Sequence, residues 1–328
     1  MDTIQAILNA MLREAVSPQT AAVAIAAIGL NIHFGFTGLL NIGQSGFMLL
    51  GAYGFAISIG QGLPLVVGVV IGFAAALVFA LVLGAPTLKL RGDYLAIVTI
   101  SAAEIIRYVG RSALLTDFTG AAQGLQGKSY RDPFTDLSFF GDGSTAIGPL
   151  DYQNTGVNGW WVRFVAWTLV ALCIVVVLLL VRSPWGRLLR GIREDEDAIR
   201  SLGKNVFAIK MQALIIGGLF GALGGMLYVL PSSVQPDSMG RSLTFFCYTA
   251  LLIGGAATIF GPVLGAIVFY SARILIKGVA NAYVPDSIMN GQQTEQFSYI
   301  VVGVALMLIV IFRPQGILGD KRELRFNV

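Results

Sequence analysis

Charged residues are scarce in this chain of 328 residues. They account for 12% of the sequence, whereas soluble globular proteins carry roughly 25%. No Asp, Glu, Lys or Arg occurs between Glu14 and Lys89. This shortage excludes an ordinary water-soluble domain. The apolar runs are also continuous and lack the alternating polarity that is typical of a transmembrane β-barrel.

Cysteine and histidine are nearly absent as well. Cys173 and Cys247 both lie inside apolar runs, and His33 is the only histidine. These three residues offer neither a disulfide framework nor the spacing of a metal site. We therefore expect no metal and no cofactor. The segment Met1 to Ser17 lacks the features of a cleaved signal peptide, so we expect an amphipathic helix at the membrane interface.

Long apolar segments make up much of the sequence. A bilayer span needs ~20 apolar residues, and charges, Gly/Pro breaks and polar loops divide the chain into nine candidate spans. These are 18–32, 36–58, 63–84, 94–111, 161–181, 211–230, 243–259, 262–279 and 297–312. The predicted fold class is all-α: a polytopic transmembrane helical bundle of about nine spans that forms a single domain over residues 1–328.

The segment around residues 31–46 allows two interpretations. It mixes glycines with polar side chains in otherwise apolar surroundings. One interpretation is a cytoplasmic turn between two spans. The other is an interrupted helix at membrane depth, which is tolerated only where protein or a water-filled cavity satisfies the freed backbone groups. In the second case the residues that line a polar translocation pathway are Asn31, Asn41, Gln44 and Ser45.

The basic residues predict the orientation of the chain. Residues 182–210 hold seven basic residues against four acidic ones, and three more basic residues follow Arg313. By the positive-inside bias both segments are cytoplasmic, which places the 112–160 loop outside and Lys89 and Arg91 inside. An odd number of spans leaves the N-terminus outside. The net charge of +4 clusters beside the spans, without interleaved aromatic residues, so we expect no nucleic-acid partner.

One stretch of the 182–210 loop combines both charge signs with apolar residues. Four acidic residues, Glu194 to Asp197, come first, and Gly203 closes the stretch. This order suits the helix dipole and a glycine stop, so it predicts a short surface helix. Its apolar residues Ala198, Ile199 and Leu202 suit docking in a groove on a soluble partner. The alternative is a solvated cytoplasmic loop.

The same stretch resembles the coupling loop of ABC importer permeases. Asp197-Ala198-Ile199 followed by Gly203 matches the pattern E-A-A-x-x-x-G, with Asp for Glu and Ile for the second Ala. Between residues 28 and 319 the chain is similar to permease subunits of branched-chain amino acid importers of the LivM type. The matching stretches are Gly29 to Asn41, Gly51 to Tyr53, Leu90 to Thr99, Gly186 to Gly203 and Arg313 to Gly319.

The resemblance implies a multi-pass subunit of the cell membrane that transports and is not itself an enzyme. It implies a second homologous permease, two cytoplasmic ATPase subunits that hydrolyse ATP, and an extracytoplasmic substrate-binding protein, all in contact with membrane lipid. It assigns coupling to the ATPase to Glu196, Asp197, Ala198, Ile199 and Gly203. The implied substrate is a branched-chain or other hydrophobic amino acid, moved by alternating access. Amides or urea, and an autonomous secondary transporter or channel, are the alternatives.

Two loop motifs and one charged pair complete the sequence evidence. Residues 119–125 resemble the family loop T-G-G-x-x-G-L, with Ala121 in place of a glycine. Residues 122–129 loosely match a phosphate-binding loop, but we expect neither the strand before it nor the helix after it, so a plain loop is predicted. Glu104 and Arg107 are spaced to pair on one helix face.

Overall fold

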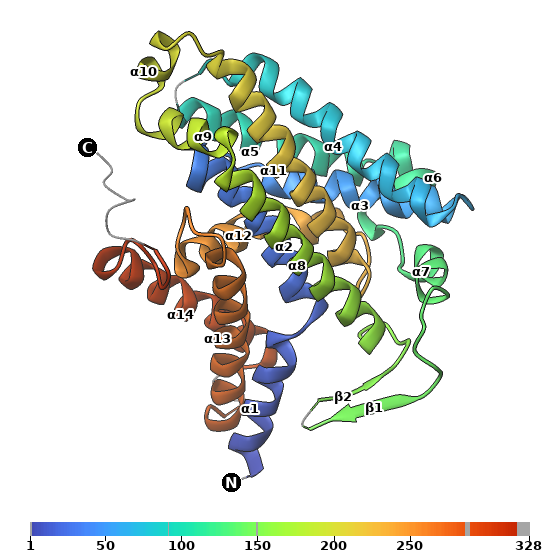
Figure 1. Cartoon of the computed structure of the whole chain (residues 1–328). Coiled ribbons are helices and arrows are strands. Elements are labelled where there is room, and N and C mark those ends of the chain that lie inside the picture. The colour runs from blue at the N-terminus through green and yellow to red at the C-terminus, as the bar shows by residue number, and fades with distance from the viewer. Residues whose placement is uncertain (1, 91, 149, 286–288, 320–328) are drawn as a thin grey trace.

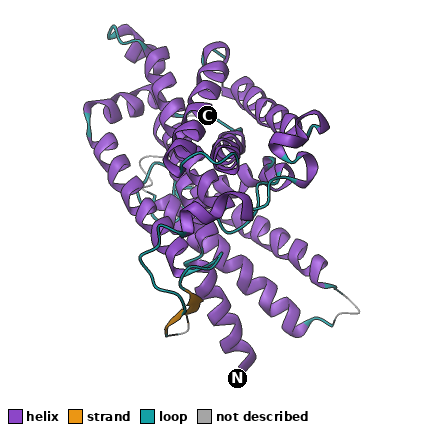
Figure 2. Ribbon diagram, turned by 90° about the vertical axis from the view of Figure 1, so that its right-hand side faces the viewer, coloured by secondary structure: helices purple, strands orange, loops and turns teal. Residues whose placement is uncertain are grey.

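The computed structural model describes residues 2–90, 92–148, 150–285 and 289–319. It is a bundle of helices with one small β-hairpin (Figures 1 and 2). The long helices are α1 Asp2–Ala15, α2 Pro18–Leu30, α3 Gln44–Gly60, α4 Leu65–Thr87, α5 Gly92–Arg111, α8 Trp160–Arg182, α9 Pro184–Glu194, α11 Val206–Val229, α12 Arg241–Gly254, α13 Gly261–Tyr283 and α14 Gly291–Phe312. The short elements are π-helix η1 Asn31–Phe36, 3-10 helices η2 Ala113–Leu115, η3 Ala121–Gln123 and η4 Pro236–Met239, helices α6 Thr116–Thr119, α7 Lys128–Thr135 and α10 Glu196–Ser201, and strands β1 Ser144–Ile147 and β2 Leu150–Gln153.

Each of the nine predicted spans overlaps a helix, and the predicted all-α fold is confirmed. Six helical segments of the described residues are long and apolar enough to cross a membrane. They are α2 with η1, α4, α8, α11, α13 and α14. Helices α3 and α12 have only 17 and 14 residues, and α5 carries four charged residues. The number of nine spans therefore stays a prediction.

Helix α2 lies at the centre of the bundle. Every residue of α2 except Gln19 is buried, and α8, α11, α12 and α13 pack around it. The helix starts where the sequence provides a cap and a fixed backbone angle, because the Ser17 hydroxyl accepts a hydrogen bond from the Thr20 amide (3.1 Å) and Pro18 follows. Alanine makes up much of α2, and its small side chain lets the neighbouring helices approach closely.

Glycines spaced four apart on α11 make close contacts with neighbouring helices. A Cβ atom on Gly225 would lie 1.9 Å from the Met48 carbonyl oxygen, and one on Gly217 would lie 2.3 Å from His33 Nε2. Gly221 packs in the same way between them. Small residues at this spacing let helices meet at backbone distance in a lipid environment. The sequence pattern thus marks the face of α11 that contacts α2, η1 and α3.

The two long loops of the chain lie at opposite ends of helix α8. The β1–β2 hairpin and α7 lie near the start of α8, whereas α9 and α10 follow its end (Figure 1). A 23-residue helix spans about 35 Å. Lys89 lies at the α10 end, 5.8 Å from the centre of the Phe207 ring. The predicted separation of residues 112–160 from 182–210 and Lys89 is therefore present, while the assignment to the outside and the inside stays a prediction. Arg91 lies outside the described residues.

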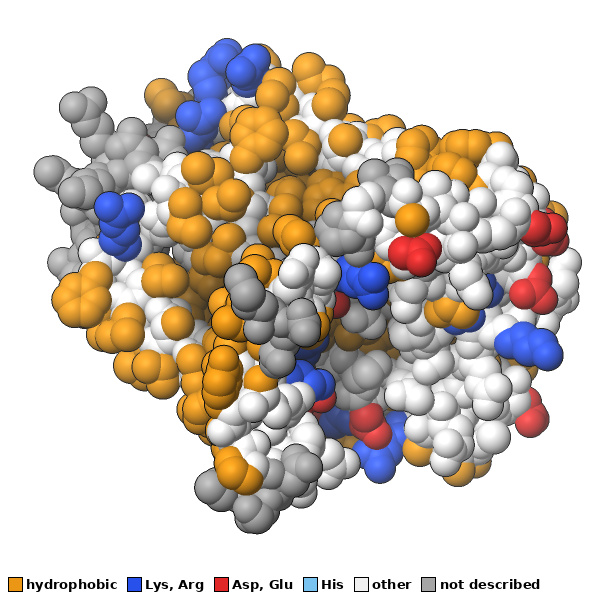
Figure 3. Space-filling model, turned by 90° about the horizontal axis from the view of Figure 1, so that it is seen from below, with side chains coloured by type: hydrophobic (Ala, Val, Ile, Leu, Met, Phe, Trp, Pro, Cys, Tyr) orange, Lys and Arg blue, Asp and Glu red, His pale blue; other side chains and the backbone are white. Residues whose placement is uncertain are grey.

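Apolar side chains are gathered on part of the surface. Viewed from the end at which α1 lies, they cover the left flank and the upper edge; acidic side chains occur at the centre and on the right, whereas basic ones occur also among the apolar side chains at the upper left (Figure 3). Along α4 and α14 many large apolar residues are exposed, for example Val66 and Val82 on α4 and Phe312 on α14, at 69%, 67% and 77%. Exposed apolar surface of this extent is what a lipid-facing periphery requires.

The glycine contacts predict the stability of two matched variants. Gly225→Ala places a methyl group against backbone and should destabilise the protein by about 1–3 kcal/mol. Gly303→Ala, in the interior of α14, meets no atom within 4 Å and should be neutral or stabilising by up to ~1 kcal/mol. Thermal unfolding in detergent checks both. Equal midpoints for the two variants would contradict the close packing at Gly225.

The predicted orientation can be checked by thiol labelling. The native Cys173 and Cys247 are 1% and 0% exposed, so the unmodified chain serves as an unreactive control. Asp142→Cys and Lys204→Cys each add an exposed thiol, one near each end of α8. With a membrane-impermeant reagent on intact cells only the Asp142→Cys variant should react, because residues 182–210 are predicted to be cytoplasmic. Labelling of Lys204→Cys from outside would invert the topology.

Candidate functional site

Helix α9 rests on the bundle through one apolar face. Ser183 caps its start, Pro184 follows, and Gly186, Leu189 and Ile192 are buried at a spacing of three residues. The Arg193 guanidinium donates to the Gly35 carbonyl oxygen in η1 (2.6 Å). This hydrogen bond joins the loop after α8 directly to the segment that follows α2.

Helix α10 is short and strongly polar. The Asp195 carboxylate caps it by accepting from the amides of Asp197 and Ala198 (2.9 and 3.0 Å). Glu196 pairs with Arg200 in the same helix (2.9 Å) and with Lys210 at the start of α11. Ion pairs on a helix surface add a few tenths of a kcal/mol each. Their contribution here is to hold α10 against α11.

The predicted coupling residues lie together on this helix and at its end. Asp197, Ala198 and Gly203 are exposed, whereas Glu196 and Ile199 are half-buried. Gly203 has a φ of +74°, as a glycine stop requires. Leu202 beside it is 73% exposed. The predicted surface helix is therefore confirmed, and it presents an apolar residue outward at its end. Glu194 belongs to the end of α9 instead of the start of this helix.

The polar segment after α2 is an interrupted helix, and the interruption is buried. The helix passes into η1, residues 38–43 are non-helical, and α3 starts at Gln44. Among residues 38–43 only Gly38 is exposed, and it has a φ of +76°. The segment is thus mostly buried, and whether it is a turn at the cytoplasmic side or an interruption at membrane depth stays a prediction. Arg193 packs over Gly38, since a Cβ atom there would lie 3.1 Å from its Cγ.

Side chains from other helices satisfy the backbone freed by the interruption. The Tyr248 hydroxyl donates to the Asn41 carbonyl (3.0 Å), and the Ile42 amide donates to the Thr99 hydroxyl (3.0 Å). The Ser45 amide donates to the hydroxyl of Thr244 (2.9 Å). The partners come from α5 and α12. Protein groups therefore meet the condition under which broken helices are tolerated within a membrane.

The polar side chains of the segment form one hydrogen-bonded cluster. Asn41 Nδ2 lies 3.0 Å from His33 Nδ1 and donates to Gln44 Oε1 (3.3 Å). Gln44 Nε2 donates to the carbonyl oxygens of Ala26 and Gly217, both at 3.2 Å. The four predicted pathway residues Asn31, Asn41, Gln44 and Ser45 are 0–2% exposed. Asn41 and Gln44 lie together, whereas the Asn31 side chain bonds to Ala257 and Thr258, and the role of all four residues in a pathway stays a prediction.

A second helix interruption faces the first. The chain is non-helical between α12 and α13, and α13 starts at Gly261, where the Gly261-Pro262 pair predicts a break. Asn31 bridges the two interruptions: its side chain donates to the Thr258 carbonyl (2.7 Å) and accepts from the Ala257 amide (2.8 Å). Sequence reasoning found both breaks but not their contact, because the two lie 226 residues apart.

The segment Arg313 to Gly319 closes the end of α12. The amides of Ile317 and Leu318 donate to the carbonyls of Ile253 and Gly254, both at 2.9 Å. These carbonyls belong to the last turn of α12, where the helix itself has no further amide that could donate to them. This motif, part of the family resemblance, is thus a structural cap for the second interruption.

The remaining sequence motifs are structural. Arg107 pairs with Glu104 (2.8 Å) as predicted, and also with Asp237 in η4 (2.5 Å). The expectation that no helix follows the phosphate-loop-like residues 122–129 was wrong, because α7 begins there at Lys128. The element before it is η3, a 3-10 helix. Ala121 has a φ of +49°, the left-handed conformation that the family's glycine adopts at lower cost.

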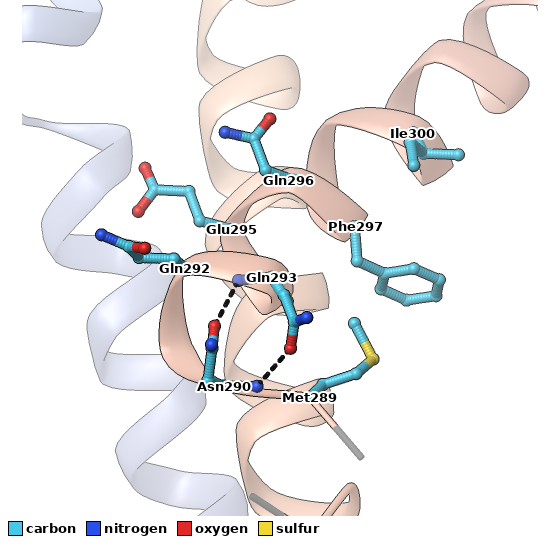
Figure 4. Close-up of a pocket in the computed structure, with 8 residues that line it drawn as sticks. All are labelled: Met289, Asn290, Gln292, Gln293, Glu295, Gln296, Phe297 and Ile300. Atoms are coloured by element: carbon cyan, nitrogen blue, oxygen red, sulfur yellow. Dashed lines mark hydrogen bonds between the residues drawn. The ribbon is translucent and has the colours of Figure 1, made fainter.

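One recess of the structure lies apart from the predicted site residues. A recess of about 770 Å³ opens at the start of α14, where Asn290 and Gln293 form a reciprocal capping box with both hydrogen bonds at 2.9 Å (Figure 4). None of the sequence-predicted site residues lines it. Over the described ranges, no three His, Cys, Asp or Glu residues are grouped so that they could hold a metal ion.

Comparison with known proteins identifies the family. Residues 13–311 match the family described as the permease component of branched-chain amino acid transport systems. The chain is 31% identical to the high-affinity branched-chain amino acid transport system permease protein LivM of Escherichia coli K12, over 92% of this chain and 69% of that protein. It is 23% identical to LivH, a permease protein of the same named system in that organism, over 90% and 91% of the two chains.

A relative with another named substrate is the guanosine ABC transporter permease protein NupQ of Bacillus subtilis. It is 25% identical, over 75% of this chain and 79% of that protein. These proteins are transport components of the cell membrane, in agreement with the membrane-spanning helices described above. The chain is therefore a member of the branched-chain amino acid type of ABC transporter permeases.

Proposed function

We propose that the chain is a permease subunit of an ATP-driven importer that moves branched-chain or other hydrophobic amino acids by alternating access. In this proposal ATP is hydrolysed in two cytoplasmic partner subunits, and their movement acts on α10. The observation that carries the proposal is the hydrogen bond from Arg193 to Gly35. It connects α9, which directly precedes the surface helix α10, with η1 at the end of the central helix α2.

The contacts of α9 and α10 indicate that a movement of α10 also moves the helices of the bundle. Glu196 pairs with Lys210 on α11, and Ile199 packs against Gly191 of α9, where a Cβ atom would lie 2.7 Å from its Cδ1. A displacement of α10 is therefore passed to α11 on one side and, through α9 and Arg193, to η1 on the other. These two elements carry Gly217 and His33, which touch each other.

The two helix interruptions are the segments that move apart in this proposal. Non-helical segments lack continuous backbone hydrogen bonding, so they absorb changes in backbone angles more readily than helices do. The cluster around Asn41 and Gln44 is the polar lining that becomes exposed when the interruptions part.

Similarity to two permeases of one named system supports a partner permease. Both LivM and LivH of Escherichia coli resemble this chain, which favours a heterodimer of homologous permeases. Most oligomers of related chains are closed and two-fold symmetric, and such a pair places a surface helix α10 opposite each of two ATPase subunits. An extracytoplasmic substrate-binding protein would dock at the end of the bundle that carries residues 112–160.

The amino acid substrate is favoured by the higher identity to LivM over nearly the whole chain. The guanosine permease has lower identity and coverage, so it shows how far the substrate varies between relatives. The sparse ionisable residues of the apolar spans also give little support to a proton-coupled secondary transporter.

Reconstituted transport tests the function. Proteoliposomes that hold the permease pair, the ATPases and the binding protein should accumulate leucine only with ATP, and urea, acetamide and guanosine should compete poorly.

Leu202→Asp should weaken ATPase binding by about 2 kcal/mol, roughly 30-fold, because it places a charge in an apolar contact. Leu114→Asp, an equally drastic change at a 95% exposed site near the other end of the bundle, is the control. Uptake that proceeds without ATP or partners would establish an autonomous transporter instead.

A variant of Gln44 tests whether the polar cluster lines the translocation pathway. Gln44→Leu keeps the approximate size of the side chain but removes its donor and acceptor groups. Leucine uptake should fall, while complex assembly and basal ATP hydrolysis persist, because the change removes polar lining without touching α10. Gln61→Leu, at an exposed position just beyond the other end of α3, is the matched control. Unchanged uptake kinetics for Gln44→Leu would leave the cluster with a purely structural role.

A further inference from the structure

A recess of about 370 Å³ lies beside α10, between the end of α4 and the start of α11. Its side chains come from three segments that are far apart in the sequence. The charged ones are Lys89, Glu196, Arg200, Lys204 and Lys210. Four basic side chains against one acidic side chain leave three positive charges in excess.

Part of this positive charge is not neutralised within the protein. Lys210 and Arg200 both pair with Glu196, and Arg200 pairs also with Asp197 (2.7 Å) outside the recess. In the described ranges Lys89 and Lys204 form no ion pair, so they carry the charge that is not neutralised. The closest described partner of Lys89 is the ring of Phe207 (5.8 Å). The recess also faces the first turn of α11, a 24-residue helix whose dipole adds positive potential at this end. An anion is the complementary ligand.

The surroundings of the recess favour an anion that carries an apolar chain. Val78 and Val82 of α4 are 59% and 67% exposed. They lie four residues apart on one face of α4, which ends at Thr87, two residues before Lys89. Helices α4 and α11 are both long and apolar enough to span the membrane, so their ends meet the level of lipid head groups. An apolar strip thus leads along α4 toward the basic recess.

We propose that this recess binds the phosphate group of an anionic phospholipid in the leaflet on the α10 side of the membrane. The phosphate lies between Lys89 and Lys204, and the acyl chains follow the exposed face of α4. The bound group also competes with Glu196 for Lys210 and Arg200, so the lipid affects how firmly α10 is held to α11. The binding itself does not depend on the proposed transport function.

Lipid binding to the detergent-purified protein, with the subunits that copurify, tests the proposal. Native mass spectrometry measures the affinity for phosphatidylglycerol and, as the uncharged comparison, phosphatidylcholine. Lys89→Gln/Lys204→Gln should weaken phosphatidylglycerol binding by about 30-fold, from the usual contribution of two basic residues near a lipid surface. Lys89→Arg/Lys204→Arg should retain it. The charge-matched control is Lys128→Gln/Arg187→Gln, which changes two exposed basic residues outside the recess.

Three results would overturn the proposal. The first is that Lys89→Gln/Lys204→Gln keeps wild-type affinity for phosphatidylglycerol, or that the control loses as much. The second is a combination of two findings: the two lipids bind equally well, and millimolar inorganic phosphate raises the thermal midpoint of the wild type but not of Lys89→Gln/Lys204→Gln. This combination identifies a site for free phosphate. The third is that lipid binding is unchanged and the copurifying subunits are lost, which identifies a protein contact.

Discussion

The structure depends on satisfying backbone groups where two helices are broken inside an apolar bundle. An unpaired amide or carbonyl at this depth costs several kcal/mol, so breaks persist only where side chains replace the missing hydrogen bonds. Here Thr99, Tyr248 and Thr244 serve the first break, and Asn31 joins it to the second. The helices that supply these groups must keep their positions. The arrangement of α2, α5, α12 and α13 follows from that requirement as much as from apolar packing.

Arg193 extends this requirement to the surface. Its guanidinium holds the Gly35 carbonyl, and its stem covers Gly38. The loop after α8 therefore takes part in the same hydrogen-bonded core that the breaks create. The buried face of α9 and the contact of Ile199 with Gly191 also hold this loop, whereas the surface ion pairs contribute little. Its attachment through α9 gives it a defined position relative to the centre of the bundle.

The sequence predicts the helices well because hydropathy, charge and Gly/Pro breaks act locally. The break at Gly261-Pro262, the glycine face of α11 and the surface helix that ends before Gly203 are all correct. The sequence does not predict that α7 follows residues 122–129, since Pro133 within it obscures the helical pattern. Nor does it reveal the contact of Asn31 with Ala257 and Thr258 or of Arg193 with Gly35, because hydrogen bonds between distant residues leave no local pattern. The polar cluster was found by composition, but its closure by protein groups required the fold.

The bridge made by Asn31 also constrains the order in which the protein can be completed. Its partner Ala257 follows 226 residues later in the chain. At a synthesis rate of ~5–20 residues per second, roughly 11 to 45 s pass before that partner exists. During this interval the first break has an unsatisfied polar side chain and must be shielded by water, lipid head groups or the insertion machinery. The final cap on α12, supplied by Ile317 and Leu318, comes later still. This cap therefore forms only after α14 has been synthesised.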